Sequence, residues 1–508
     1  MENNRNELKV GLVLSYINLI IGNLIPLMFT PIMLSLLGQN EYGLYKLSST
    51  ITGYLGLISM GIGSAVTRYL IKANKEGGQH AEENMFGMFL IIFRIIAFTS
   101  ICVGLVILYF LPTFYGNSLS TYEMSRMKIL VFIMVLNMAI SFILSPYISI
   151  VTSHEKFIFY HTINIISTCV VPIVNLAILY IGYKSIGMAV SSLSIIVLTR
   201  FMYYVYLKRS LKFKPRYDNM PTSILKEIFI FSFWVFIGNI VGQLYNATDT
   251  VMIGAIPSLA TVGVAIYSVG NVFNGVIISI STNLTNMLVP KVNKMIFSET
   301  NNQELTDLCI RVGRLQGYIV CLIVGGFIVF GRPFIHYYVG DEYRQGYDVA
   351  LWVMIPHVIP LLQSNCLSVV LARNLHKFRS LTYLIIAILN VIGTWFLLPY
   401  YGIIGAACMS GIAFILGQGF TMNWYYHKVV GLDMICFWKK NLPQLLLSFI
   451  LSTLFILSGR YIDYYNIQTL IISICVYTIL YAISSWLIVF NPYEKHLVTS
   501  MLVKLNCK

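Results

Sequence analysis

The chain has 508 residues, of which 57% are hydrophobic and only 11% are charged, and its formal net charge is +14. About a quarter of the residues of a typical soluble domain are charged, so this composition excludes an ordinary soluble protein. Apolar runs of about eighteen or more residues recur from end to end and predict a polytopic helical membrane protein. A transmembrane β-barrel would instead alternate apolar and polar residues in segments of about ten.

In chain order, the apolar runs predict about fourteen membrane spans. The first follows a short polar tail and is too long to be the apolar core of a cleaved signal peptide, so we expect it to remain as a span. The predicted spans lie near residues 10–37, 43–71, 84–111, 127–151, 157–181, 185–207, 226–254, 260–289, 311–331, 347–371, 379–398, 402–426, 441–458 and 466–490.

The basic residues predict the orientation of these spans. With the N-terminus in the cytoplasm, most of the 34 lysines and arginines fall in cytoplasmic segments, which is the positive-inside pattern. Both termini are then cytoplasmic, and the net charge reflects topology and contact with anionic headgroups, with no need for nucleic acid as a partner. The outer segments carry only Arg126, Lys128, Lys184, Arg332, Arg344 and Arg460.

Two parts of the chain resemble each other. Ile21-Gly22-Asn23 recurs as Ile237-Gly238-Asn239, and at the same spacing Gly38 recurs as Gly254. Tyr42-Gly43 is matched in turn by Val262-Gly263, and Lys156-Phe157 by Lys377-Phe378. Weak internal symmetry between blocks of apolar segments is typical of transporters, in which the substrate path lies between two similar halves.

The repeat predicts a domain organisation. Residues 1–207 form an N-lobe of six spans, 208–225 a basic cytoplasmic linker, and 226–427 a C-lobe of six spans in the same orientation. Residues 428–508, with spans thirteen and fourteen and a cytoplasmic tail, have no counterpart in the repeat. All outer loops are short, which argues against a membrane glycosyltransferase or polymerase with a catalytic outer domain.

No catalytic motif or cofactor site is predicted. The sequence has no Walker A, GxSxG, HExxH, kinase or Rossmann pattern, so we expect neither ATP hydrolysis nor enzymatic catalysis. The nine cysteines are scattered without a CxxC pair and are interpreted as small apolar residues, so neither a metal nor a disulfide is expected.

Cations inside the apolar runs are the candidate substrate-binding residues. Arg94 lies about ten residues into the third span, too deep to reach the surface easily, and lines a cavity or bridges two helices. Lys46, Arg68 and Arg200 are further candidates, each with the alternative of a side chain that extends to the headgroups. Cavity cations without matching acids indicate an anionic substrate, because arginine binds phosphate oxygens in bidentate geometry.

Two other residues are candidates for coupling or gating. Asp249 is the one clear carboxylate within a span and either binds a coupling cation, pairs with an arginine or makes a helix-end hydrogen bond. His357 lies between Pro356 and Pro360, which should break the helix at that point.

Residues 37–69 carry a resemblance to a known family. The pattern comprises Leu37-Gly38, Glu41-Tyr42-Gly43-Leu44-Tyr45, Gly53-Tyr54-Leu55-Gly56-Leu57, Met60-Gly61-Ile62-Gly63-Ser64-Ala65 and Arg68-Tyr69. It resembles the polysaccharide transporter family, the Wzx-type O-antigen flippases of the multidrug/oligosaccharidyl-lipid/polysaccharide (MOP) exporter superfamily. With the span count, the likeness extends over essentially the whole chain.

The resemblance implies an all-α fold with two six-helix lobes in a V-shaped arrangement like that of the MATE transporters, plus two extra C-terminal helices. It implies translocation of an undecaprenyl-diphosphate-linked oligosaccharide, for O-antigen (lipopolysaccharide), capsule or exopolysaccharide, across the bacterial cytoplasmic (inner) membrane by alternating access. Membrane lipids, a polysaccharide polymerase and a chain-length regulator are the implied partners. Arg68 matches the family pattern directly, whereas Ser59 stands where many relatives have an acid, which weakens the case for proton or sodium coupling.

Two alternatives lie within the same superfamily. A multidrug or cation exporter would be expected to carry carboxylates deep in the first span, and the sequence has none between Val10 and Leu37. A lipid II-type flippase for a peptidoglycan precursor would share the same physics with a different sugar.

Overall fold

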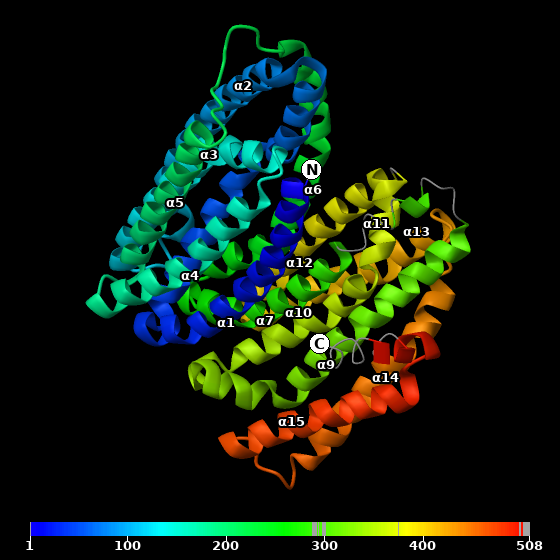
Figure 1. The fold of residues 1–508 in the computed structure, drawn as a ribbon. Coiled ribbons are helices and arrows are strands. Elements are labelled where there is room, and N and C mark those ends of the chain that lie inside the picture. Colours follow the sequence, from blue (N-terminus) through cyan, green and yellow to red (C-terminus); the bar gives the residue numbers. More distant parts are fainter. Residues whose placement is uncertain are drawn as a thin grey trace. The chain divides into compact units, whose positions relative to one another are not determined.

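The computed structural model describes residues 2–286, 292, 294–296, 301–373, 375–496 and 499–500. The described residues are almost entirely helical and include no strand (Figure 1). The chain divides into two compact units, Met1–Ser268 and Val269–Lys508, which are described separately below as unit 1 and unit 2.

Unit 1 begins with two very long helices. Its elements are α1 (Glu2–Gly53), the 3-10 helix η1 (Tyr54–Ser59), α2 (Ile62–Tyr115), α3 (Thr121–Ser153), α4 (Phe157–Ile181), α5 (Lys184–Arg209), the 3-10 helix η2 (Thr222–Ile224), α6 (Leu225–Ala255) and the start of α7 (Ala260–Asn286). The later part of α7 belongs to unit 2.

Unit 2 continues with shorter helices and two π-helical segments. They are α9 (Asn302–Val339), the 3-10 helix η3 (Asp341–Tyr343), α10 (Gln345–Leu362), α11 (Ser364–Ala372), α12 (His376–Phe414), the π-helix η4 (Ile415–Thr421), α13 (Met422–Lys428), α14 (Met434–Ser458), α15 (Ile467–Ser484) and the π-helix η5 (Ser485–Val489).

The longest helices contain glycine kinks. The 52 residues of α1 and the 54 of α2 would each be roughly 80 Å long if straight, against a hydrocarbon core of about 30 Å. Each is interrupted by one glycine with positive φ, Gly38 at 74° and Gly78 at 67°. Only glycine adopts these angles without strain, so Gly38 divides α1 and Gly78 divides α2 into a longer and a shorter helical segment.

Ten described helices are long and apolar enough to cross a membrane, or up to twelve if each of two bent helix pairs forms one span. One of the ten, Lys377–Lys428, has 52 residues and a further kink at Gly402. The expectation of a multi-pass helical membrane protein is confirmed, whereas the number of fourteen spans stays a prediction.

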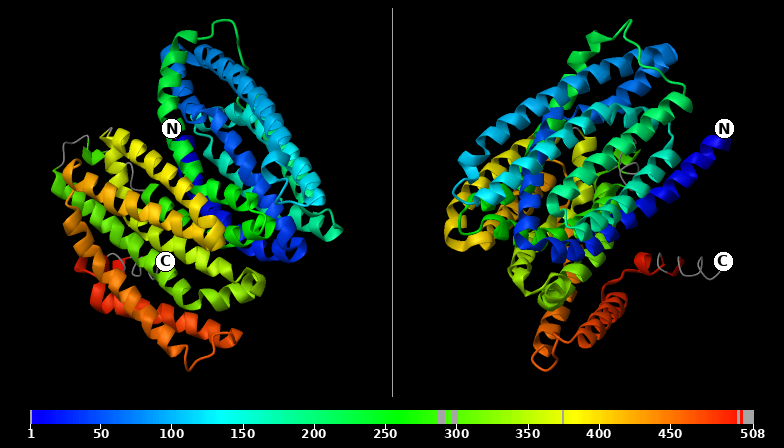
Figure 2. Two further views of the ribbon diagram at one scale, coloured as in Figure 1. Left: turned by 180° about the vertical axis from the view of Figure 1, so that it is seen from behind. Right: turned by 90° about the vertical axis from the view of Figure 1, so that its left-hand side faces the viewer.

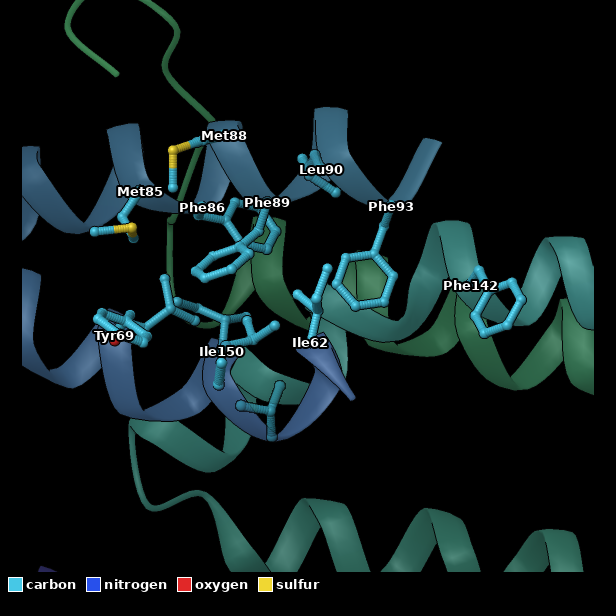
Figure 3. Packing of buried hydrophobic residues seen from close by; sticks show 14 of the residues in the cluster. Ile62, Tyr69, Met85, Phe86, Met88, Phe89, Leu90, Phe93, Phe142 and Ile150 are labelled. Carbon is cyan, nitrogen blue, oxygen red and sulfur yellow. The ribbon is translucent and has the colours of Figure 1, made fainter. Parts of the chain in front are cut away.

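A large apolar core holds unit 1 together. Phe86, Phe89 and Phe93 of α2 point toward Ile62 and Tyr69, which precede them on the same helix, and toward residues of α3 (Figure 3). At about 25 cal/mol per Å² of buried apolar surface, each buried phenylalanine contributes roughly 1.5–3 kcal/mol. This core packs the helices of unit 1 together at its Gly78 end. Arg94, which follows Phe93 on α2, lies outside the core and is exposed.

The basic segment predicted as a linker, residues 208–225, is attached to unit 1. Phe213 is buried against Phe86, with ring centroids 5.6 Å apart. The guanidinium Nε of Arg216 donates to the Glu83 carboxylate at 2.8 Å, and the Arg216 amide donates to the Glu83 carbonyl. The segment is therefore packed along α2, and α6 also belongs to unit 1; the division into six-span lobes stays a prediction.

In unit 2, α14 and α15 pack beside α9 (Figure 2). A buried ion pair joins them: Arg314 of α9 donates from Nε and Nη2 to the Glu494 carboxylate at 2.6 and 2.8 Å. Arg314 also donates to the carbonyls of Lys440 and Val489 and to the Tyr318 hydroxyl, so each of its three guanidinium nitrogens makes a hydrogen bond. Such a pair stabilises only while both partners are present, because either one alone is a buried, uncompensated charge.

We therefore predict that Glu494→Gln destabilises the protein by about 3–5 kcal/mol, the usual cost of removing one partner of a buried ion pair. Thermal unfolding in detergent measures the effect. Glu304→Gln, an exposed residue in the first turn of α9, is the matched control. Equal melting temperatures for the two variants would contradict the structural role of the pair.

The same pair predicts a pH dependence. Burial raises the pKa of Glu494, but hydrogen bonds from Arg314 and Asn491 outweigh it and hold that pKa below its ordinary value. The stabilisation is therefore present above the unfolded pKa of about 4.3 and is lost as the pH falls through the lower, folded value. The melting temperature of the wild type should fall more steeply in acid than that of Glu494→Gln.

Candidate functional site

The second predicted span is broken in its middle. After α1 ends at Gly53, the chain forms the tight helix η1, and Met60 and Gly61 then take left-handed φ values of 47° and 72° before α2 begins. A Cβ at Gly61 would lie 2.7 Å from the Val235 side chain of α6. Irregular backbone at membrane depth is tolerated only where protein or a cavity covers it, and here α6 covers it.

Polar side chains of α6 and α7 face the broken segment. The Tyr54 hydroxyl of η1 lies 2.8 Å from Thr248 Oγ1 of α6. The next residue, Asp249, is 1% exposed, and its Oδ2 accepts a hydrogen bond from the Tyr267 hydroxyl of α7 at 2.5 Å. A buried carboxylate thus lies beside a discontinuous helix, and many transporters form their substrate and ion sites at discontinuous helices.

A group of polar contacts, called the polar seam below, joins α1, α3, α5 and α7 at the Gly38 end of unit 1. Glu41 forms an ion pair with Arg126 of α3 at 2.5 Å and accepts a hydrogen bond from Ser185 of α5. Thr261, at the start of α7, donates to Glu123 at 3.0 Å and to Asn40 at 3.3 Å. These contacts join segments far apart in sequence and border a cavity of about 420 Å³.

The seam brings together two segments that the internal repeat relates. A Cβ on Gly43 would lie only 1.8 Å from the carbonyl oxygen of Thr261, the residue before Val262-Gly263. The backbones of the two repeat segments therefore touch at this point, and only glycine permits the contact. At the adjoining ends of α2 and α6, Tyr115 donates to the Val251 carbonyl and Ser118 to the Gly254 carbonyl.

The four predicted cations lie on three helices, two of them on α2. Arg94 is exposed on α2 and lies near Tyr147 of α3, and Arg68 is exposed on α2 beside the Tyr69 ring. Lys46 is half-buried on α1, with its Nζ 5.5 Å from the Tyr42 ring centroid. Each of these three cations has a tyrosine as an aromatic neighbour.

Arg200 of α5 has the least satisfied environment of the four. Its guanidinium carbon lies 6.0 Å from the Tyr203 ring centroid. Its Nε and Nη1 atoms are buried and have no hydrogen-bond partner among the described residues. Buried polar atoms without a partner cost about 1–3 kcal/mol each, so the site favours an acceptor.

His357 is in unit 2, where the structure corrects one expectation. α10 continues through Pro356 and His357 to Leu362, and the 50° bend follows at Gln363. Pro356 has no N–H to donate to the Trp352 carbonyl. The helix nevertheless continues, because the Pro356 ring and this carbonyl pack closely against α12. A Cβ on Gly411 of α12 would lie 2.4 Å from the Trp352 carbonyl oxygen. The His357 ring packs on Phe414, with centroids 3.9 Å apart, and its Nδ1 lies 3.1 Å from the Val353 carbonyl.

No pattern in the sequence predicts the Glu41–Arg126 pair or the hydrogen bonds that Thr261 makes with Glu123 and Asn40. In the sequence, Glu41 belongs to the family pattern and Arg126 is one of the basic residues of the outer segments, and nothing relates the two residues. In the sequence Gly61 appears only within the family pattern, and the structure shows that it permits the close approach of α6. The repeat was the signal that could have placed Gly43 against the start of α7.

The geometry defines a class of protein: a multi-pass helical membrane protein in which a broken span is covered by a later helix. Solved structures with a similar fold include the following two. The lipid II flippase MurJ, in an inward closed conformation, is 15% identical with a TM-score of 0.73, and the match covers 96% of this chain and 99% of that one. An inward-facing MATE family multidrug transporter of the MOP superfamily is 14% identical with a TM-score of 0.61, covering 84% and 99%.

Residues 8–295 match the family of polysaccharide biosynthesis proteins, and the chain belongs to that family. A search of curated proteins gives no match. The expected fold class, all-α and similar to the MATE transporters, is confirmed, as is the resemblance to a polysaccharide transporter family of the MOP superfamily.

The seam yields a prediction. Gly43→Ala places a methyl group on the Thr261 carbonyl and should separate α1 from α7, which lowers the melting temperature by several degrees and reduces transport. Gly22→Ala is the matched control, because Gly22 belongs to the same repeat and a Cβ there meets nothing within 4 Å. Thermal unfolding of both variants in detergent gives the comparison, and identical melting temperatures would contradict the close backbone contact.

Proposed function

We propose that this protein translocates an undecaprenyl-diphosphate-linked oligosaccharide from the cytoplasmic to the outer leaflet of the bacterial cytoplasmic membrane. The substrate is a repeat unit of O-antigen, capsule or exopolysaccharide, moved by alternating access. A polysaccharide polymerase and a chain-length regulator would receive the product. The N- and C-termini would be cytoplasmic, as the positive-inside pattern predicts.

One observation supports an anionic, diphosphate-linked substrate: three of the predicted cations, Lys46, Arg94 and Arg200, form no ion pair among the described residues. An unpaired arginine in hydrocarbon costs at least about 2.5–3.5 kcal/mol, so such residues serve a polar path or a ligand. In a polysaccharide biosynthesis protein, the diphosphate of a lipid-linked sugar is the anion that fits.

Reconstitution tests the proposal. Purified protein in liposomes is given a fluorescent undecaprenyl-diphosphate oligosaccharide, and leaflet exposure of the label is followed over time. Protein-dependent movement of this lipid, but not of lipid II or a cationic dye, is expected. Movement of lipid II alone would transfer the assignment to a peptidoglycan-precursor flippase, and extrusion of the dye alone to a drug exporter.

Arg94 gives the sharpest variant in this assay. Arg94→Ala should slow translocation by about tenfold or more while membrane insertion is unchanged, because one charge-assisted hydrogen bond contributes about 1.5–3 kcal/mol. Arg94→Lys should retain part of the rate, since the charge remains and the bidentate geometry is lost. Arg209→Ala, at the exposed end of α5, is the control; full activity of Arg94→Ala would remove Arg94 from the site.

Asp249 and His357 are proposed as the coupling and gating residues. Asp249→Asn should abolish any acceleration by a proton or sodium gradient and leave the gradient-independent rate, whereas Tyr267→Phe keeps the carboxylate and should keep the gradient response. His357→Gln removes the ring that packs on Phe414 and should change the rate without changing the gradient response. An Asp249→Asn variant that responds to gradients as the wild type does would exclude the coupling role.

A further inference from the structure

Unit 2 contains a basic pocket that the transport proposal does not use. A cavity of about 440 Å³ lies where α9, α14 and the segment after η5 meet, and its lining includes the cations Arg311, Arg314 and Lys440 and one acid, Asp307. The positive-inside pattern assigns this end of unit 2 to the cytoplasmic surface of the membrane.

The wall of the pocket is held by the buried Arg314–Glu494 pair. Arg314 is fixed by Glu494, by the Tyr318 hydroxyl at 2.7 Å and by two backbone carbonyls, so its charge is neutralised and its position is set. Asn491 and Glu494 exchange backbone-to-side-chain hydrogen bonds at 2.9 and 2.8 Å, which order the chain segment that closes the pocket. The pocket is therefore pre-formed, and little ordering entropy opposes binding there.

Arg311 and Lys440 supply the charge available to a ligand. Arg311 is exposed and lies over the Tyr493 ring at 5.4 Å, without an acidic partner among the described ion pairs. Lys440 Nζ lies 3.7 Å from Asp307, but both side chains are about half exposed, 52% and 44%, and such pairs contribute little. Lys495 adds a further cation nearby, 5.9 Å over the Trp486 ring.

The two elements that contribute Lys440 and Val489 to the pocket, α14 and η5, also carry exposed apolar side chains. Ile435 at the start of α14 and Leu487 and Ile488 of η5 are exposed large hydrophobic residues. Trp486 and Tyr493 are of the type that lies at membrane interfaces. A pre-formed basic pocket between helices at the cytoplasmic surface, with apolar side chains beside it, matches a ligand that has a phosphate head and acyl chains.

We propose that this pocket binds the phosphate headgroup of an anionic phospholipid of the inner leaflet, with Arg311 and Lys440 as the phosphate-binding residues. The bound lipid would hold the C-terminal segment and α14 to α9. The site is independent of the transported substrate, so the proposal does not depend on the function proposed above.

Native mass spectrometry of the full chain, released from nanodiscs of phosphatidylglycerol and phosphatidylcholine, tests the proposal. Arg311→Gln and Lys440→Gln should each weaken retention of phosphatidylglycerol by about fivefold, with a multiplicative loss in the double variant, because each basic residue near an anionic surface contributes about one kilocalorie per mole. Lys439→Gln is the matched control, since Lys439 is exposed and adjacent to Lys440 in sequence but does not line the pocket.

The melting temperature provides a second measurement. Phosphatidylglycerol should raise that of the wild type and of Lys439→Gln, and should raise that of the double variant less. Equal retention by the double variant and the control would overturn the proposal, as would equal retention of phosphatidylcholine and phosphatidylglycerol. Complete displacement of the lipid by inorganic phosphate would show that the site binds a free anion, and the lipid assignment would then be wrong.

Discussion

Unit 1 depends on one contact, the packing of α6 over the break in the second span. Backbone amides and carbonyls have no water to bond with in hydrocarbon, so a span that leaves the helical path must be enclosed by protein. Gly61 allows α6 to come within van der Waals distance of the break, and the Tyr54–Thr248 hydrogen bond fixes the two segments side by side. The irregular backbone is thus retained at a cost, and such breaks are kept where function needs them.

The polar seam at the Gly38 end complements this cover. Gly43 brings the backbone of the second span onto the start of α7, and Thr261 connects that contact to Glu123 and Asn40. Short polar contacts of this kind are individually weak, about 0.5–1.5 kcal/mol for each neutral hydrogen bond, and so can be broken and re-formed during a transport cycle. The apolar core around Phe89, by contrast, provides the rigid part of unit 1.

The sequence predicts the local part of this structure well. Hydropathy identifies the helices, and the glycine repeat marks Gly38 and Gly43 as special positions. It does not predict which residues meet, because contacts such as Glu41–Arg126 join helices through three-dimensional packing that no local pattern encodes. At His357 a local pattern predicts a feature that packing removes. Pro356 predicts a break in the helix, but α12 packs against this turn at Gly411 and the helix continues. The bend comes later, at Gln363.

The distribution of charge partners links the fold to the proposed substrate. Three buried carboxylates pair with an arginine: Glu41 with Arg126, Glu83 with Arg216, and Glu494 with Arg314. The buried Asp249 accepts a hydrogen bond from the Tyr267 hydroxyl. Lys46, Arg94 and Arg200 have tyrosines as neighbours and no ion pair among the described residues. Positive charge within the spans thus has fewer counter-ions than buried negative charge, and this asymmetry favours an anionic ligand that passes through the membrane.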